Sequence, residues 1–294
     1  MRGIILNANA KINLGLDVLG VREDGYHEVR MIMHSLELSD EIMLEKTEGE
    51  ILIKTDSREI PSDQSNLCYK AAELMKREYG IEQGVAVTVK KRIPVAAGLA
   101  GGSTDAAAVM TGMNSLFGLS LSEGQLMKQG VKIGADVPFC IMKGCALSEG
   151  IGEKLTGLKN LPKCGIILFT PKISISTGTV YKKLDQFGVR AHPDTEGMLK
   201  AIDSGDLKGL AGLMKNVLEP VTASEHEVIR ETEERFMEMG ALGAVMSGSG
   251  PTVFSIFEDR KRAEDAYDIL RTQMPEGQLI LTEPVGKGGI DGGS

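Results

Sequence analysis

Residues 94–108 read PVAAGLAGGSTDAAA, and the rest of the chain is organised around this stretch. Val85, Val87 and Val89 alternate with other residues before it and predict a strand. The alanine-rich run at its end predicts a helix. The three glycines between allow positive φ and a close approach of a ligand to the main chain. A helix that starts after such a loop presents N–H groups to an anion, and phosphate is the anion we expect.

The same stretch excludes two common nucleotide-binding motifs. A Walker loop ends in Gly-Lys-Ser/Thr, but no lysine lies between Lys91 and Lys128. The spacing of the glycines also differs from that of a dinucleotide fingerprint. Ser103 or Thr104 is expected to cap the following helix. On these residues alone, a tight strand-to-helix turn that binds no ligand remains an alternative.

Length, composition and charge narrow the class of protein. The 294 residues suit one large or two ordinary domains, and 42% of them are hydrophobic. A net charge of −8 argues against nucleic acid as a partner. No apolar run approaches the ~20 residues of a membrane span, and the first residues do not resemble a signal peptide, so we expect a cytoplasmic location. The four cysteines form no C-x-x-C pair and are expected to be buried free thiols.

The N-terminal residues predict a strand with two distinct faces. Residues 3–19 alternate between apolar and polar side chains, as in a half-buried strand. This alternation places Lys11 and Asn13 on the same face, two residues apart. By pattern alone that face is either exposed to solvent or functional. The sequence Asp24-Gly25 then predicts a turn.

The remaining chain alternates between predicted strands and helices. A capping box at Ser122 and Gln125 opens one helix. A Gly, Pro and Lys stretch at 156–163 is the expected junction between domains 1–155 and 156–294. We expect two or three strands in 31–55 with a hairpin turn at 48–50, and further strands at 165–169, 243–246, 253–257 and 278–283. We expect a helix at 62–80, capped by Asp63 or Ser65 and closed by Gly80, one from the loop to about 117, and others at 174–184 (capped by Ser176 or Thr177), 195–203, 206–217, 224–239 and 259–273. The tail at 286–294 is expected to fray.

Separated motifs, in the expected order, resemble those of the GHMP kinases. The loop at 94–108 is similar to their phosphate loop, although Ala96, Ala97 and Ala100 stand where glycine or another small residue is common. The methyl group of Ala100 is expected to restrict φ and to crowd a phosphate. GADVPF at 134–139 is similar to the Gly-x-Asp-Val-Pro-Phe that the family carries, with an ordinary turn aspartate as the alternative. SGSGPT at 247–252 resembles the third motif, which folds back against the phosphate loop, with a plain glycine-rich hairpin as the alternative.

The resemblance implies a fold and an activity. The fold is α+β, with an N-terminal domain like ribosomal protein S5, a C-terminal ferredoxin-like domain, and substrate and nucleotide in the cleft between them. The activity is ATP-dependent phosphorylation of a small-molecule alcohol with Mg²⁺. AKINL at 10–14 and REDGYH at 22–27 resemble one branch of the family, which phosphorylates the 2-hydroxyl of a cytidyl diphosphate sugar alcohol in the non-mevalonate isoprenoid pathway.

Two alternatives remain open at this point. One is another small-molecule GHMP kinase, of the homoserine or mevalonate type. The other is a non-catalytic nucleotide-binding regulator on the same scaffold. In each case the expected partners are small molecules, without nucleic acid or membrane, and the chain is expected to be a monomer or homodimer.

The resemblance also implies roles for residues in the chemistry. Asp136 is the expected catalytic base, which either abstracts the proton of the substrate hydroxyl or orients that hydroxyl. Lys11 is expected to supply a positive charge near Asp136 and the transferring group. Ser103 or Thr104 is expected to contact Mg²⁺. The residues expected to bind ATP are Pro94, Ala96, Ala97, Gly98, Leu99, Ala100, Gly101, Gly102, Ser103, Thr104 and Asn66.

Four residues are implied to bind the second substrate. Tyr26 and Tyr181 are expected to sandwich the cytosine, His27 to bind its polar edge, and Asn13 to contact the substrate. Three of them have a structural alternative: surface residues for the Tyr-His pair at the turn and a half-buried helix residue for Tyr181. Asn66 is likewise either an adenine contact or a simple helix cap.

Overall fold

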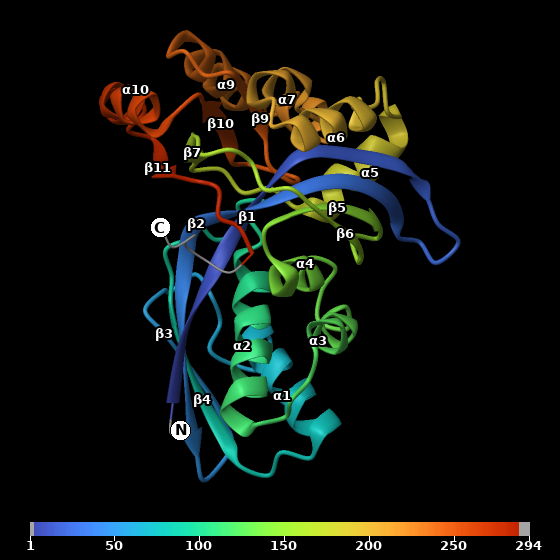
Figure 1. Ribbon diagram of the computed structural model, residues 1–294, viewed down its shortest axis with the longest axis vertical. Coiled ribbons are helices and arrows are strands. Elements are labelled where there is room, and N and C mark those ends of the chain that lie inside the picture. Colours follow the sequence, from blue (N-terminus) through green and yellow to red (C-terminus); the bar gives the residue numbers. More distant parts are fainter. Residues whose placement is uncertain (1–2, 288–294) are drawn as a thin grey trace. The chain divides into compact units, whose positions relative to one another are not determined.

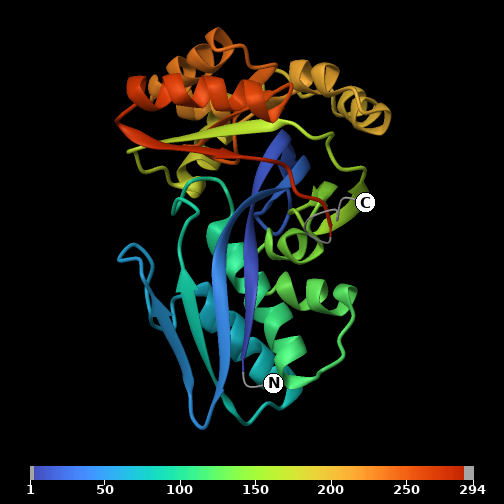
Figure 2. The ribbon, with the colours of Figure 1, turned by 60° about the vertical axis from the view of Figure 1, so that its left-hand side comes forward.

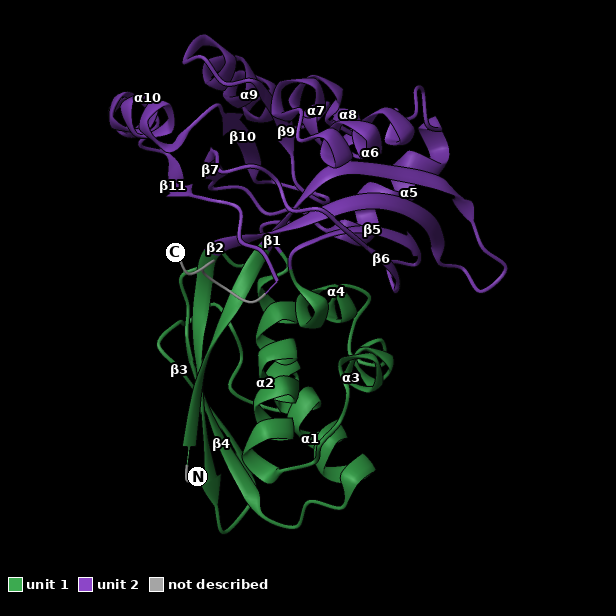
Figure 3. Ribbon diagram, in the orientation of Figure 1, with its two compact units in different colours: residues 1–10, 38–95, 100–143 green, residues 11–37, 96–99, 144–294 purple. Residues whose placement is uncertain are grey.

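The computed structural model describes residues 3–287 and divides into two compact units, coloured in Figure 3. Unit 1 runs to Ala10 and includes Leu38–Val95 and Ala100–Lys143; unit 2 comprises Lys11–Glu37, Ala96–Leu99 and the chain from Gly144 onward. Both units are discontinuous because the two long strands β1 and β2 contribute to each of them. The single boundary near residue 155 remains a prediction.

Unit 1 is a sheet with helices on one face (Figures 1 and 2). The strand order is β3-β4-β2-β1, and the three valines of the predicted strand are buried in β4. The hairpin turn predicted at 48–50 is wrong. A hairpin would pair β3 with β2, the strand before it, whereas β3 pairs in parallel with β4. The elements are β1 (Gly3–Val21), β2 (His27–Thr47), β3 (Ile51–Thr55), β4 (Gly84–Lys90), α1 (Leu67–Tyr79), α2 (Gly101–Phe117), α3 (Glu123–Gly130) and α4 (Val137–Met142).

The helix ends of unit 1 follow local side-chain chemistry. The capping box predicted at Ser122 is present at the start of α3. Gly80 ends α1 in the left-handed conformation, as predicted. The predicted cap of α1 is wrong, because Asn66 rather than Asp63 or Ser65 caps it. Asp63 instead accepts the Ser65 N–H at 2.8 Å in the turn before the helix.

A buried cluster of charges fastens α2 to the sheet in unit 1. The Lys91 ammonium lies between the carboxylates of Asp40 and Asp105, with 2.9 Å to Asp105. Asp40 also accepts the N–H groups of Arg92 and Ile93. Burial raises the pKa of Asp105 to about 7, against the lowering effect of Lys91. The cluster therefore connects the strand ends to the helix that follows the phosphate loop.

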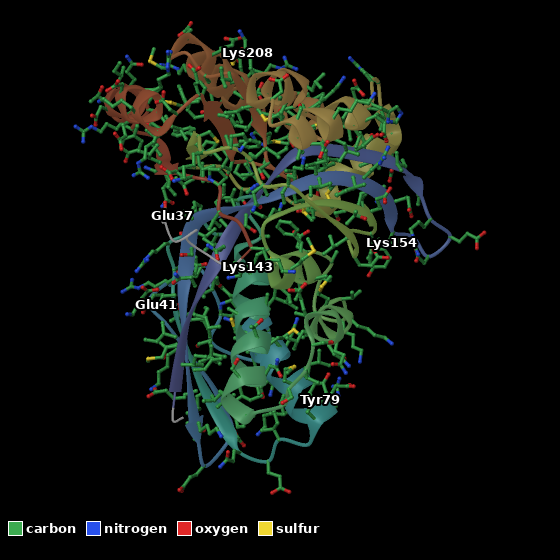
Figure 4. The ribbon with its side chains drawn as sticks, in the orientation of Figure 1. Glu37, Glu41, Tyr79, Lys143, Lys154 and Lys208 are labelled. Atoms are coloured by element: carbon green, nitrogen blue, oxygen red, sulfur yellow. The ribbon has the colours of Figure 1, made fainter. Side chains whose placement is uncertain are left out.

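Lys143, labelled in Figure 4, shows how β1 is held at the end of α4. Its backbone has φ +58° and ψ −178°, a conformation that costs a non-glycine residue about 1–3 kcal/mol. Its ammonium donates to Asn7 O at 3.1 Å and to Asn9 Oδ1 at 2.9 Å. Burial lowers the pKa of Lys143. The two hydrogen bonds to β1 offset part of the backbone strain.

Unit 2 contains an antiparallel sheet, β11-β7-β10-β9, against which α9 and α10 pack (Figure 1). The junction predicted at 156–163 begins inside a strand, because β6 pairs with β5 as far as Leu158. The helix predicted at 206–217 ends early and is followed by a short strand, β8. The elements are β5 (Cys145–Gly150), β6 (Lys154–Leu158), β7 (Gly165–Pro171), α5 (Thr177–Phe187), α6 (Thr195–Ser204), α7 (Leu207–Leu213), β8 (Lys215–Asn216), α8 (Glu219–Ala223), α9 (Val228–Glu238), β9 (Gly243–Met246), β10 (Val253–Phe257), α10 (Arg260–Gln273) and β11 (Gly277–Thr282).

Other predictions for unit 2 are confirmed. Ser176 caps α5, and the strands expected near 165, 243, 253 and 278 are present. The four cysteines form no disulfide and are buried, and burial raises the pKa of Cys145 to about 12. Of the tail predicted to fray at 286–294, residues 288–294 lie outside the described residues.

His34 on β2 is a buried neutral histidine in unit 2. Its Nδ1 lies 2.8 Å from Ser35 O, and its Nε2 lies 3.2 Å from the Leu161 backbone nitrogen. These partners define one tautomer, in which Nδ1–H donates and Nε2 accepts. Burial lowers the pKa of His34 to about 4. Protonation would turn the Nε2 acceptor into a donor that faces another donor.

Candidate active site

Lys11 and Asn13 point to the same side of β1, as the alternation predicts, and both are buried, with 4% and 1% of their surface exposed. The Lys11 ammonium donates to Asn13 Oδ1 at 2.7 Å and to Gly98 O at 2.9 Å. Because an ammonium rarely lies fully inside a protein without a partner, these two acceptors fix its position. Their face of β1 is therefore not a solvated outer face.

The phosphate loop ends in an uncapped helix. Ala100 is the N-cap of α2, has φ +58°, and makes no side-chain capping bond. The prediction that Ser103 or Thr104 caps this helix is wrong, because both lie within its first turn. The first N–H groups of a helix lack intrahelical acceptors, and Ala100 offers no side-chain acceptor to them. This helix start thus retains the donors that an anion requires.

The third motif contacts the phosphate loop within unit 2. Ser247 Oγ donates to Gly98 O at 3.0 Å, and the Thr252 N–H donates to Ala97 O at 3.4 Å. Gly98 has φ +77°, and a Cβ added there would lie 2.2 Å from Ser247 O. Ser247 Oγ also accepts the Asn13 N–H at 3.4 Å. The turn at 247–252, the loop at 96–99 and strand β1 therefore meet at one point.

Asp136 lies in unit 1 at the start of α4. It is half-buried, occupies the N-cap position, and makes no side-chain capping bond to its own helix. A Cβ added at Gly134 would lie 3.8 Å from Ser103 Oγ. The segment that carries Asp136 therefore lies beside the first turn of α2, where the phosphate loop ends.

Asn66 and Leu67 lie at the start of α1, also in unit 1. Asn66 Oδ1 accepts the Cys68 N–H at 2.8 Å, and its Nδ2 donates to Pro61 O. A Cβ added at Gly102 would lie 3.2 Å from Leu67 Cδ1. Asn66 thus serves as a helix cap next to the phosphate loop, while its contact with adenine remains a prediction.

The turn between β1 and β2 presents Tyr26, which is 60% exposed. The next residue, His27, packs against Tyr181 with ring centroids 4.6 Å apart and planes tilted by 41°. Its Nε2 lies 2.8 Å from Asp185 Oδ1. Since Tyr181 and Asp185 are four residues apart on α5, they lie on the same face of that helix. The structure thus brings His27 and Tyr181 into contact, and the hydrogen bond to Asp185 orients the His27 ring.

Comparison with known proteins identifies the family. The models "GHMP kinases N terminal domain" and "GHMP kinases C terminal" match residues 66–144 and 198–276. A 4-diphosphocytidyl-2-C-methyl-D-erythritol kinase of Acetivibrio thermocellus is 50% identical over 97% of this chain and 100% of the relative, and one of Alkaliphilus metalliredigens is 48% identical over 95% and 97%. The chain belongs to the 4-diphosphocytidyl-2-C-methyl-D-erythritol kinase family of GHMP kinases.

Solved structures agree with this assignment. A crystal structure of 4-(cytidine 5'-diphospho)-2C-methyl-D-erythritol kinase matches with a TM-score of 0.81 and 31% identity over 96% of this chain and 100% of the other. A homoserine kinase from Cytophaga hutchinsonii matches with a TM-score of 0.78 and 18% identity over 97% and 95%, which shows a shared fold alone. The predicted family and the α+β GHMP kinase fold are therefore confirmed. Between residues 3 and 287, no helix is long and apolar enough to cross a membrane.

Sequence reasoning missed three polar residues around the site. Asp185 was detectable, because it follows Tyr181 by one helical turn in a predicted helix. Asn216 and Glu219, which hold the third motif in unit 2, had no comparable signal. The Asn216 side chain donates to Met246 O, about thirty residues away, and Glu219 accepts the Met246 N–H at 2.8 Å. Such partners depend on the tertiary fold rather than on spacing along the chain.

Proposed function

We propose that this chain transfers the γ-phosphoryl group of ATP to the 2-hydroxyl of 4-diphosphocytidyl-2-C-methyl-D-erythritol. Relatives with this name match at 46–50% identity over nearly the whole chain. One observation of the structure supports the proposal most directly: the buried Lys11 ammonium is held on Gly98 O of the phosphate loop. Enzymatic phosphoryl transfer depends mainly on positioning and on stabilising charge, and a fixed cation at this loop provides both.

The phosphate loop and Asp136 complete the proposed chemistry. The uncapped N–H groups of α2 bind ATP phosphates, with the loop from Pro94 to Thr104 around them. Asp136 accepts the proton of the substrate hydroxyl or orients that hydroxyl; both roles require a carboxylate that is not consumed by capping its own helix. Asn66 and Leu67, next to the loop, would border the adenine. Asn13, which accepts a hydrogen bond from the Lys11 ammonium, is proposed to contact the sugar alcohol.

Mg²⁺ is the cofactor proposed with ATP, and Ser103 suits it better than Thr104. Thr104 is only 1% exposed within α2, whereas Ser103 is half-buried in the first turn. A hydroxyl oxygen is a hard ligand of the kind that Mg²⁺ prefers, and phosphates and water supply the other positions. The metal ion would neutralise charge on the phosphates. Ser103 is therefore the residue we propose as its protein contact.

The cytidyl end of the substrate is proposed to bind at the Tyr26 turn. Tyr26 and Tyr181 would enclose the base, and His27 would bind its polar edge. When His27 Nε2–H donates to Asp185, the neutral ring has Nδ1 as an acceptor. The exocyclic amino group of cytosine is a donor, whereas uracil has a carbonyl oxygen at that position. This arrangement favours cytidyl over uridyl substrates.

A substrate panel tests the proposal. The protein is incubated with ATP, Mg²⁺ and, separately, the cytidyl substrate, its uridyl analogue, homoserine and mevalonate, and products are identified by mass spectrometry. We expect phosphorylation of the cytidyl substrate and a much lower rate with the uridyl analogue. Turnover of homoserine or mevalonate alone would indicate another GHMP kinase. ATP binding without turnover of any acceptor would indicate a regulator.

The proposal also covers cellular location and oligomeric state. We propose a cytoplasmic location, tested by cell fractionation, and a monomer or homodimer, tested by light scattering on the full chain.

A further inference from the structure

Asn216 on β8 lies beneath the third motif, with 2% of its surface exposed. Its Nδ2 donates to Met246 O and to Gly248 O, both at 2.7 Å. Its Oδ1 accepts the Leu218 N–H at 2.9 Å. These bonds use both amide protons and the carbonyl oxygen. Only this orientation of the amide works, since a flipped amide would place Oδ1 against two carbonyl oxygens.

The backbone of Asn216 is attached to the strand that carries Lys11. β8 pairs in parallel with β1, with Asn216 opposite Leu16. The Val217 N–H also donates to Leu16 O at 3.0 Å. Asn216 therefore joins β1 to the turn at 247–250 through its backbone on one side and its side chain on the other.

The turn that Asn216 holds touches Lys11 and the acceptor of Lys11. A Cβ added at Gly248 would lie 3.1 Å from Gly98 O and 3.5 Å from Lys11 Nζ. Ser247 Oγ in the same turn donates to Gly98 O at 3.0 Å. A shift of the Gly248 peptide would therefore displace the Gly98 carbonyl, the ammonium bound to it, or both.

We propose that Asn216 is a positioning residue for phosphoryl transfer. It fixes the turn at 247–250, and that turn in turn fixes the Gly98 carbonyl and the Lys11 ammonium. Asn216 acts through these groups and need not contact substrate. This inference rests on the proposed kinase function and deepens it, because it names a residue outside the motifs that sets the geometry of the reacting end.

Asn216→Asp is the sharpest perturbation, because it keeps the shape and replaces the NH2 group, with its two donors, by one oxygen that faces the carbonyls of Met246 and Gly248. We expect kcat to fall about 10²-fold, the effect of misplacing a catalytic group by about 1 Å, with KM values changed only a few-fold. The matched control is Asn114→Asp at the end of α2. Asn114 also binds backbone with both side-chain atoms, to the N–H and C=O of Leu121, but lies outside the site. We expect kcat of this control to stay within about three-fold of wild type.

A double-mutant cycle separates positioning from a general loss of structure. If Asn216 acts through Lys11, then Asn216→Asp has little further effect in a Lys11→Ala background, measured by single-turnover rates. Additive losses would overturn the proposal, as would a folded Asn216→Asp enzyme with kcat within about three-fold of wild type. Should the Asp variant fail to fold, the same cycle with Asn216→Ser, which keeps one donor, decides in the same way.

Amide hydrogen exchange gives a readout that needs no substrate. In Asn216→Asp we expect faster exchange in peptides that cover 96–99 and 245–252, and unchanged exchange elsewhere in unit 2. Asn114→Asp should leave those peptides protected. If wild type fails to use the cytidyl substrate, the proposed function fails while exchange still tests the link from Asn216 to the loop. Unchanged exchange at 96–99 would overturn that link.

Discussion

Replacing Gly98 by alanine tests whether the phosphate loop has to touch the third motif. Gly98 has φ +77°, a conformation that costs an L-residue roughly 1–2 kcal/mol. The added Cβ would lie 2.2 Å from Ser247 O and 3.2 Å from Gly250 O. Carbon–oxygen contacts in proteins are about 3.3 Å or longer, so the loop or the turn has to move by about 1 Å.

The size of the effect follows from what the Gly98 carbonyl holds. It accepts the Lys11 ammonium at 2.9 Å and Ser247 Oγ at 3.0 Å. A displacement of about 1 Å at a reacting group can lower the rate about 10²-fold. We therefore expect kcat for the cytidyl substrate to fall by about this factor. The backbone strain alone should lower Tm by only a few degrees.

The assay is steady-state kinetics with both substrates, together with thermal unfolding. Gly124→Ala on α3 is the matched control, because its added Cβ would enter open space and alanine favours a helix. This control should keep full activity and gain stability of up to about 1 kcal/mol. A folded Gly98→Ala enzyme with kcat within a few-fold of wild type would show that the contact with Ser247 does not position the reacting groups.

Three further predictions follow from the site and the core. Asp136→Asn should lower kcat at least ~10²-fold with little change in substrate KM, and turnover near wild type would remove Asp136 from the mechanism. Tyr26→Ala should raise KM for the cytidyl substrate by about one to two decades without changing ATP affinity, whereas Tyr26→Phe should have little effect; normal saturation by the Ala variant would contradict base stacking. Burial lowers the pKa of His34 from 6.5 to about 4, so the native state resists protonation of this ring. The resulting stability is present above pH 6.5 and is lost as the pH falls toward 4, and urea unfolding should show a loss of about 3 kcal/mol in the free energy of unfolding. A His34 ring that titrates near 6.5 by NMR would refute this.

Local patterns in the sequence predicted much of the fold. The alternation over β1 correctly placed Lys11 and Asn13 on one side, because side-chain direction in a strand has a period of two. The capping box at Ser122 was correct because its partners lie three residues apart. The hairpin predicted at 48–50 was wrong because the sequence of an apolar strand does not indicate which strand it pairs with. β3 pairs in parallel with β4 rather than with β2.

Long-range contacts of the site were the least predictable part. Asn216 has no pattern around it that indicates a role, and its partners lie 30 and 32 residues further along the chain. Conversely, His27 was expected to be functional from a motif, but its bond to Asp185, 158 residues away, appears only in the structure. Motifs therefore located the loop and the turns, while the side chains that hold them together required the tertiary fold.

The wrong prediction for the cap of α2 follows from the nature of the site. Capping rules assume that the protein satisfies the first N–H groups of a helix with its own side chain, as Asn66 does for α1. α2 instead begins at Ala100, which has no side-chain acceptor. A serine or aspartate there would occupy the donors, and an aspartate would also repel a phosphate by its charge. The uncapped start of α2 is therefore consistent with a helix whose cap is the phosphate of a ligand.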